Sequence, residues 1–222
     1  MFGIDPTPFD VRLVAFRIPV RVHPSFWLGM IFFGWNPGRL DLVFIWVICA
    51  FVSILIHELG HAFTAEWFGW PTEIVMYFGG GLAISARYRN HTPGRSIAMS
   101  FMGPAAGFML FGLLIGVHIL LIHFQVRIND YLSKTLRILE FMNLYWGLLN
   151  LLPVLPLDGG YIFQSLCQMM RVRDPSALAS KVGVVVAGAA AYYFFVTTKQ
   201  EYAGILMLML CLQNVSSLQS RR

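Results

Sequence analysis

Three ionisable side chains lie close together in a stretch of sequence that is otherwise apolar. Residues 54–61 (ILIHELGH) contain the pattern H-E-x-x-H. In a helix, His57 and His61 share one face, where their imidazoles can bind one zinc ion, and Glu58 beside them can act as a general base. Ionisable groups inside a membrane helix are costly and usually mark a function. The pattern therefore predicts a metal-dependent hydrolase centre; the plainer alternative is that these side chains only bond to neighbouring helices.

A second motif can supply the ligand that this centre lacks. A catalytic zinc ion usually takes three protein ligands and keeps a fourth position for water, and Asp158 is the candidate for the third. It lies in residues 150–160 (NLLPVLPLDGG), where two prolines break a helix and two glycines let the backbone approach another group. Irregular backbone at membrane depth is tolerated where it lines a cavity. A surface turn is the alternative for this segment alone, but beside H-E-x-x-H the ligand role is favoured.

The elements that must position these residues are membrane segments. Apolar side chains make up 57% of the 222 residues and charged side chains only 12%, against about a quarter in soluble domains. About 20 apolar residues in a helix cross the bilayer. Six segments are expected, the first of them short: 24–36, 40–69, 97–124, 135–152, 181–198 and 202–219. We therefore expect an all-α polytopic membrane protein in which residues 1–222 form one membrane-embedded domain, with no separate soluble domain.

The basic residues indicate the orientation of these segments. The net charge of +5 does not point to nucleic acid, because no basic run with interleaved aromatic residues occurs. With six segments both termini share one side, and cytoplasmic flanks carry the excess of Lys and Arg. Eleven basic residues flank the inner ends, Arg12, Arg17, Arg21, Arg87, Arg89, Arg95, Arg171, Arg173, Lys181, Arg221 and Arg222, against five outside, Arg39, Arg127, Lys134, Arg137 and Lys199. We expect a multi-pass protein of the inner (cytoplasmic) membrane, with its termini and the opening of its active site toward the cytoplasm. Residues 1–10 lack the features of a secretory signal, so the first apolar segment is expected to stay as an anchor.

Two segments alternate apolar and polar residues as strands do. Residues 72–89 (TEIVMYFGGGLAISARYR) alternate on either side of three glycines, which predicts a β-hairpin. Residues 11–22 (VRLVAFRIPVRV) are also strand-like, with Pro19 limiting that strand to an edge or a break. We expect a small sheet at the cytoplasmic face. Its hairpin either holds an unwound substrate as an added strand, with Gly79 and Gly80 on the substrate side, or only joins two helices.

The fourth predicted membrane segment carries a polar stripe. Glu140, Asn143, Gly147 and Asn150 follow one another at helical steps and share one face, which is expected to look into a wet cavity. For Glu140 and Asn143 we expect bonds to neighbouring helices. Thr64, one turn beyond the second histidine, either supports a metal ligand or bonds to its own backbone.

The motifs HELGH and NLLPVLPLDGG together resemble those of the site-2 protease family of intramembrane metalloproteases. The segments IPVRVHPSFW at 18–27 and FGG at 78–80 also resemble that family, as does Gly103-Pro104. Many members have Asn where this chain has Gly107. Gly103 and Gly107 form a small-xxx-small pair, for which close helix packing is the preferred interpretation.

The resemblance implies hydrolysis of a peptide bond in or near a transmembrane segment of a membrane protein, in the setting of regulated intramembrane proteolysis. It implies one Zn²⁺ per chain bound by His57, His61 and Asp158, with Glu58 as the base and Asn150 as a donor to the developing oxyanion. The expected partners are the lipid bilayer, a transmembrane substrate and regulatory membrane proteins. Two alternatives stay open: a catalytically silent homologue that binds membrane proteins, which the intact Glu58 disfavours, and a metal or ion carrier, which would need more half-buried acids along a pathway.

Overall fold

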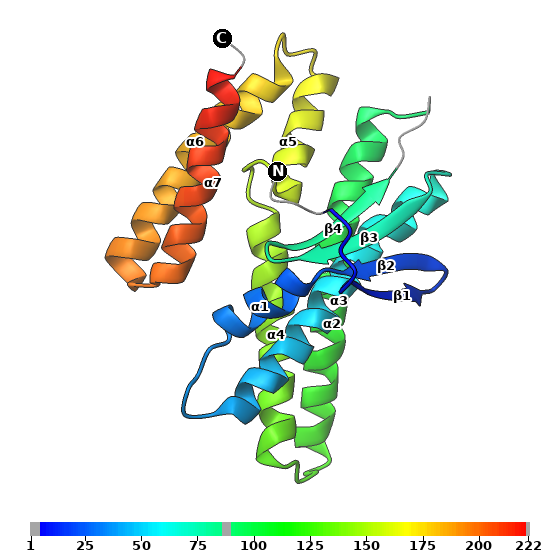
Figure 1. Cartoon of the computed structure of the whole chain (residues 1–222), viewed down its shortest axis with the longest axis vertical. Helices are drawn as coiled ribbons and strands as arrows, with labels where there is room; N and C mark the ends of the chain where they lie inside the picture. The colour runs from blue at the N-terminus through cyan, green and yellow to red at the C-terminus, as the bar shows by residue number, and fades with distance from the viewer. Residues whose placement is uncertain (1–4, 86–89, 221–222) are drawn as a thin grey trace. The chain divides into compact units, whose positions relative to one another are not determined.

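The chain folds mostly into helices, with one small sheet, as the sequence predicts. The structure is a computed structural model that describes residues 5–85 and 90–220 (Figure 1). Its elements gather into two compact units. The first unit contains Met1–Arg89 and Met102–Gly147, and the second contains Asn90–Phe101 and Leu148–Arg222. Each unit has its own apolar core.

The first unit contains a four-stranded sheet in the order β1-β2-β3-β4. Its strands are β1 (Val11–Ala15), β2 (Ile18–Val22), β3 (Thr72–Tyr77) and β4 (Gly80–Ser85). β1–β2 and β3–β4 are antiparallel hairpins, and β2 joins them by pairing parallel to β3. The predicted hairpin at 72–89 is thus confirmed over 72–85, while residues 86–89 lie outside the described part of the chain.

The strand-like stretch 11–22 forms a hairpin because the chain turns at Phe16 and Arg17. These two residues have φ of 50° and 73°, and the residues on either side of them pair directly. Positive φ at both positions is typical of a two-residue type I′ turn, in which glycine or asparagine is usual. Pro19 lies one residue before Val20, where pairing with β3 begins. Pro19 has no N–H to donate, but no hydrogen bond to β3 is required at this position. The proline is therefore accommodated inside β2.

One face of the sheet packs against the helix that carries H-E-x-x-H. This helix, α2 (Leu40–Trp67), contacts both β3 and β4. The shorter α1 (Pro24–Phe33) contacts α2 and β3, and begins where Nδ1 of His23 accepts a hydrogen bond from the amide of Ser25. Inward-facing strand residues join helix residues in one buried cluster that includes Ile18, Val20, Val22, Phe26, Ile54, Leu59, Ala62, Ile74 and Met76. The apolar alternation of the strands therefore fixes the sheet onto the C-terminal half of α2.

Two further helices complete the first unit. α3 (Pro93–His123) belongs to it from Met102 onward, and α4 (Asp130–Asn150) belongs to it as far as Gly147. At Gly60, α2 approaches α3 so closely that a Cβ would overlap the carbonyl group of Met102. Close approach through small residues is typical of helix packing in membranes.

The second unit is built on a helical hairpin. α6 (Pro175–Tyr193), continued by the π-helical turn η1 (Phe194–Thr198), lies beside α7 (Glu201–Gln219); the two are orange and red in Figure 1. α5 (Asp158–Met169) precedes this hairpin and contacts α6. The sequence does not predict α5, because the prolines and glycines around its start are typical of a turn.

Four of the described helices are long and apolar enough to cross a membrane: α2, α3, α6 with η1, and α7. The other two predicted segments form helices that fall short of this. α1 has only 10 residues, and α4 carries Lys134, Arg137 and Glu140. The chain is therefore an integral membrane protein by the length and composition of these four helices.

Candidate metal centre

His57, Glu58 and His61 lie together in the interior of the first unit. Every residue from His57 to Ala62 is buried, so this part of α2 faces protein on all sides. The three side chains are 3%, 5% and 6% exposed. Nε2 of His57 is 3.1 Å from Nε2 of His61, and ligand atoms of all three residues lie within 4.8 Å of one another. The predicted motif forms one compact, buried cluster.

The two imidazoles have the spacing of a tetrahedral metal site. Zinc–nitrogen bonds of about 2.0–2.1 Å at a tetrahedral angle place two nitrogens about 3.3 Å apart. The observed separation of 3.1 Å is close to this value, and the ring planes stand at 81° to each other. Two imidazole donors on one helical face, with a carboxylate beside them, form a donor set that zinc prefers. The residues present therefore fit a zinc ion.

A glycine of α3 makes room for the imidazole of His61. A Cβ on Gly103 would overlap the ring at Nε2, so a larger residue requires the imidazole to move. A Cβ on Gly107, one turn further, would stand 3.5 Å from the carbonyl oxygen of Asn143 on α4, which is an ordinary packing contact. The packing role expected for both glycines therefore suits Gly107, whereas Gly103 sets the space available to a histidine of the cluster.

A glycine of β4 lies against Glu58. A Cβ on Gly81 would overlap Cγ of Glu58 and stand 2.7 Å from its Oε1. The sequence predicts Gly79 and Gly80 as substrate-side residues; a Cβ on Gly80 would instead meet the ring of Trp146 at 3.0 Å. The run of three glycines was the available signal, but sequence alone does not tell which of them faces the carboxylate.

The polar stripe of α4 bonds to neighbouring helices, as expected for two of its members. Nδ2 of Asn143 donates to Oγ of Ser53 on α2 at 2.9 Å. Oε1 of Glu140 lies 2.9 Å from Nδ1 of His118 on α3. Thr64 donates to the carbonyl one turn back in its own helix at 2.8 Å, which is the second of its two predicted roles. These contacts hold the helices of the unit together around the buried cluster.

The second unit contains Asn150 and Asp158, at the two ends of one irregular loop. Asn150 is 8% exposed at the end of α4, and Asp158 is half-buried in the first turn of α5. A Cβ on Gly159 would overlap the backbone of residues 151 and 152, and one on Gly160 would stand 2.6 Å from the backbone of residues 154 and 155. The two glycines therefore let the loop fold back against the first turn of α5, the close approach that the sequence predicts.

A residue that sequence reasoning missed, Asn214 of α7, holds this loop in place. It is 1% exposed, and its Nδ2 donates to the carbonyl oxygens of Leu155 at 2.6 Å and of Leu210 at 2.8 Å. Gly183 of α6 leaves the space that the amide occupies. Leu155 and Asn214 also line a cavity of about 310 Å³ within the unit. A lone amide in an apolar helix was the available signal, since such groups usually bond to a neighbouring element in membrane proteins.

Comparison with known proteins points to one family. The model of peptidase family M50 matches residues 117–194, a range that contains Asn150 and Asp158. A zinc metalloprotease of Methanocaldococcus jannaschii is 29% identical over 164 residues, which is 71% of this chain and 45% of that protein. Stage IV sporulation protein FB of Bacillus subtilis is 30% identical over 146 residues, which is 64% of this chain and 46% of that protein. The chain spans about half the length of the curated relatives it matches.

The fold has a counterpart among solved structures. The site-2 protease from Methanocaldococcus jannaschii matches with a TM-score of 0.65 at 24% sequence identity, over 95% of each chain. This likeness shows a shared fold. In sequence the chain is similar to zinc metalloproteases and, over residues 117–194, to peptidase family M50, and it shares the fold of a site-2 protease.

Proposed function

We propose that this chain is an intramembrane zinc metalloprotease that hydrolyses a peptide bond in or near a transmembrane segment of a membrane protein. The observation that carries the proposal is the burial of His57, Glu58 and His61 as one cluster inside an apolar helix of 28 residues. Three ionisable groups buried at membrane depth are costly unless they serve a function. Glycines leave room for two of them, which supports a built site rather than incidental polar packing.

In this proposal His57, His61 and Asp158 bind one zinc ion per chain. Zinc, when bound, polarises the peptide carbonyl and acidifies a water molecule. Glu58 accepts a proton from the attacking water, and its burial beside the histidines keeps that carboxylate close to the reaction. Asn150, as the family motif implies, donates a hydrogen bond to the oxyanion that develops on the scissile carbonyl.

The substrate must present an extended scissile bond, because a helix hides its carbonyl groups. β4 is an edge of the sheet in the described part of the chain, and its first residues are glycines. Strand addition at such an edge holds a peptide extended through backbone hydrogen bonds. We therefore assign Gly79 and Gly80 to the substrate side of the hairpin. The next residue, Gly81, lies against Glu58, which supports a position of this glycine run close to the proposed catalytic carboxylate.

The proposal includes six membrane segments in one domain, with α1 and α4 added to the four apolar helices. The excess of basic residues on one set of flanks supports a cytoplasmic position in the inner membrane for both termini and for the opening of the site. Of the residues in that count, Arg87, Arg89, Arg221 and Arg222 lie outside the described part of the chain.

The test is cleavage by the purified chain. Wild type and Glu58→Gln are reconstituted with a membrane protein that has a single transmembrane helix, and both bound zinc and cleavage are measured. We expect Glu58→Gln to bind zinc like the wild type but to cleave at least about a hundredfold more slowly, since it lacks the base. His57→Ala and Asp158→Ala should also lose zinc.

Three results would count against the proposal. Equal cleavage by wild type and Glu58→Gln would show that the activity has another source. Zinc binding without cleavage of any substrate in a panel of helices would favour a silent homologue. Zinc passage across a sealed vesicle would favour a carrier.

A further inference from the structure

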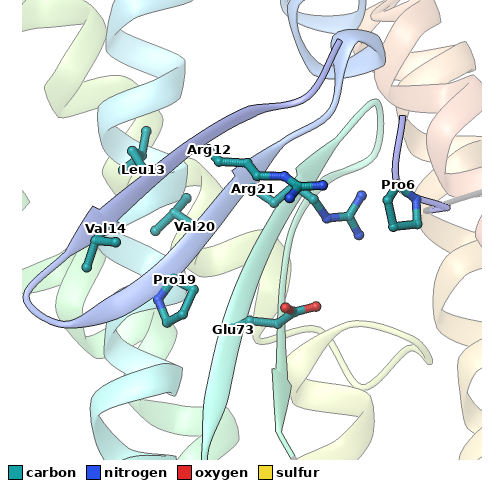
Figure 2. A pocket seen from close by; sticks show the side chains of 8 residues that line it. All are labelled: Pro6, Arg12, Leu13, Val14, Pro19, Val20, Arg21 and Glu73. Carbon is teal, nitrogen blue, oxygen red and sulfur yellow. The ribbon is translucent and has the colours of Figure 1, made fainter. Parts of the chain in front are cut away.

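A cavity of about 440 Å³ lies on the outer face of the sheet, away from its buried face. Figure 2 shows the side chains that line it, which come from β1, β2, β3 and the segment before β1: Pro6, Arg12, Leu13, Val14, Pro19, Val20, Arg21 and Glu73. We call it the hairpin cavity. Its charged side chains are two arginines and one glutamate, so charge can take part in recognising a ligand.

The two arginines of the hairpin cavity are direct neighbours across the strands. Arg12 of β1 pairs with Arg21 of β2 in the antiparallel register. Like charges directly opposite one another destabilise a sheet. Arg21 is compensated, because Nη1 lies 3.0 Å from Oδ2 of Asp10, whose side chain is fully buried. Within the described part of the chain, Arg12 has no hydrogen bond or ion pair, so one positive charge of the pair is left without an anion.

The anion beside Arg21 is firmly ionised. The Thr7 hydroxyl donates to Asp10 at 2.6 Å, and this bond, followed by the Thr7 amide and Arg21, lowers the pKa of the Asp10 carboxyl to about 2 against the cost of burial. Asp10 therefore already accepts three hydrogen bonds, two from Thr7 and one from Arg21. The exposed guanidinium of Arg12 is therefore available to an anion from outside this set of residues.

The turn of the hairpin that carries this cavity lies near the end of an apolar helix. At the hairpin's turn, the ring of Phe16 packs edge-on against Phe63 of α2, with centroids 5.8 Å apart. Phe63 is half-exposed four residues before the end of this apolar helix, and Trp67 at that end is 86% exposed. Exposed aromatic residues at the end of a membrane helix are typical of the lipid–water interface. The turn of the hairpin therefore meets α2 where the lipid headgroups begin.

We propose that the hairpin cavity binds the phosphate of an anionic lipid headgroup, with the guanidinium of Arg12 as its main donor. A planar guanidinium suits a phosphate because it can donate two parallel hydrogen bonds. A lipid is favoured over a free anion because Val14 and Phe16 are exposed beside the cavity and continue onto the aromatic side chains of α2, a surface for acyl chains. The carboxylate of Glu73 limits the negative charge that the cavity accepts, which favours a singly charged phosphodiester.

The test measures lipid binding directly, by native mass spectrometry of the full chain in detergent titrated with phosphatidylglycerol or phosphatidylcholine. Arg12→Gln should weaken binding of phosphatidylglycerol about fivefold, the effect of one basic residue at an anionic surface, and leave phosphatidylcholine unchanged. Arg173→Gln is the matched control, because Arg173 is exposed, lies outside the cavity and belongs to the same predicted side of the membrane. It should leave phosphatidylglycerol binding within about twofold of the wild type.

A second variant distinguishes a specific effect on binding from misfolding. Glu73→Gln removes the cavity's negative charge and should strengthen phosphatidylglycerol binding, which no loss of structure would do. Equal losses from Arg12→Gln and Arg173→Gln would overturn the proposal in favour of general surface charge. Displacement of the lipid by millimolar inorganic phosphate would overturn it in favour of a site for free anions. If binding of an acidic peptide depends on Arg12 while binding of the lipid does not, the cavity is a site for a protein instead. Binding measured in a Glu58→Gln background keeps this result separate from the protease activity.

Discussion

Replacing Asn214 by leucine should loosen the loop that carries Asp158 while the second unit stays folded. The amide of Asn214 is the donor that reaches from α7 to the carbonyl of Leu155, three residues before Asp158. Leucine has a similar volume and fills the space beside Gly183, so it leaves little cavity. The other carbonyl that Asn214 bonds, on Leu210, keeps its backbone partner in the helix. The change therefore removes one specific contact between α7 and the loop.

The magnitude follows from the hydrogen bonds involved. Loss of the bond to Leu155 costs about 1 kcal/mol, and up to about 3 kcal/mol if that carbonyl stays buried without a donor. Leucine also removes Oδ1 of Asn214, a buried acceptor that has no partner among the described residues, which offsets about 1 kcal/mol or more. The free energy of unfolding should therefore fall by only about 1 kcal/mol. The affinity for zinc should fall about tenfold, the lower end of the range for contacts that support a metal ligand.

Competition with a chelator measures the zinc affinity, and thermal unfolding of the metal-free chain measures the stability. Cys211→Ala is the control, since Cys211 also links α7 to α6, through the carbonyl of Val184, but does not bond to the loop. It should leave the zinc affinity unchanged. An Asn214→Leu chain that binds zinc like the wild type would refute the positioning role, provided that Asp158→Ala lowers the affinity. If Asp158→Ala has no effect either, the ligand assignment is wrong instead.

Three further outcomes are expected. Gly103→Ala should displace the imidazole beside it and weaken zinc binding about tenfold or more, because metal sites tolerate little displacement of a ligand. Gly112→Ala is its control and should bind zinc normally, because a Cβ at Gly112 meets nothing within 4 Å among the described residues. Gly81→Ala should push aside the carboxylate of Glu58, the proposed general base, and lower the cleavage rate about a hundredfold with zinc still bound; equal losses of zinc and rate would contradict this. The pKa of Asp10 is depressed from 3.8 to about 2, so its contribution to stability is present above pH 3.8 and is lost as the pH falls toward 2; unfolding followed over that range should depend less on pH in Asp10→Asn.

The features that the sequence predicts correctly are those that a single element encodes. H-E-x-x-H needs only one helical turn to bring its histidines together, and the observed cluster lies within α2. The strands over 72–85 follow from local alternation around a glycine run. The membrane helices follow from length and composition. α4 is the exception, because its charged residues make it less apolar than the four helices that can cross a membrane.

The missed features depend on contacts between distant segments or on unusual local geometry. The turn at Phe16 and Arg17 uses positive φ without glycine or asparagine, so no residue type marks it. α5 begins inside a motif whose prolines and glycines indicate a turn. The bond from Asn214 to Leu155 joins residues 59 positions apart. No periodic pattern records such a contact.

The glycines around the buried cluster explain how a membrane helix can contain three ionisable side chains. Lipid cannot hydrogen-bond these groups, so protein must enclose them, and the enclosing elements must approach the helix closely. Gly60 brings α2 against the backbone of α3, Gly103 admits the ring of His61, and Gly81 brings β4 against Glu58. At each of these positions a Cβ would overlap either the cluster itself or the backbone that closes over it. The same absence of side chains that lets the elements close around the cluster therefore also fixes how much room its imidazole and carboxylate have.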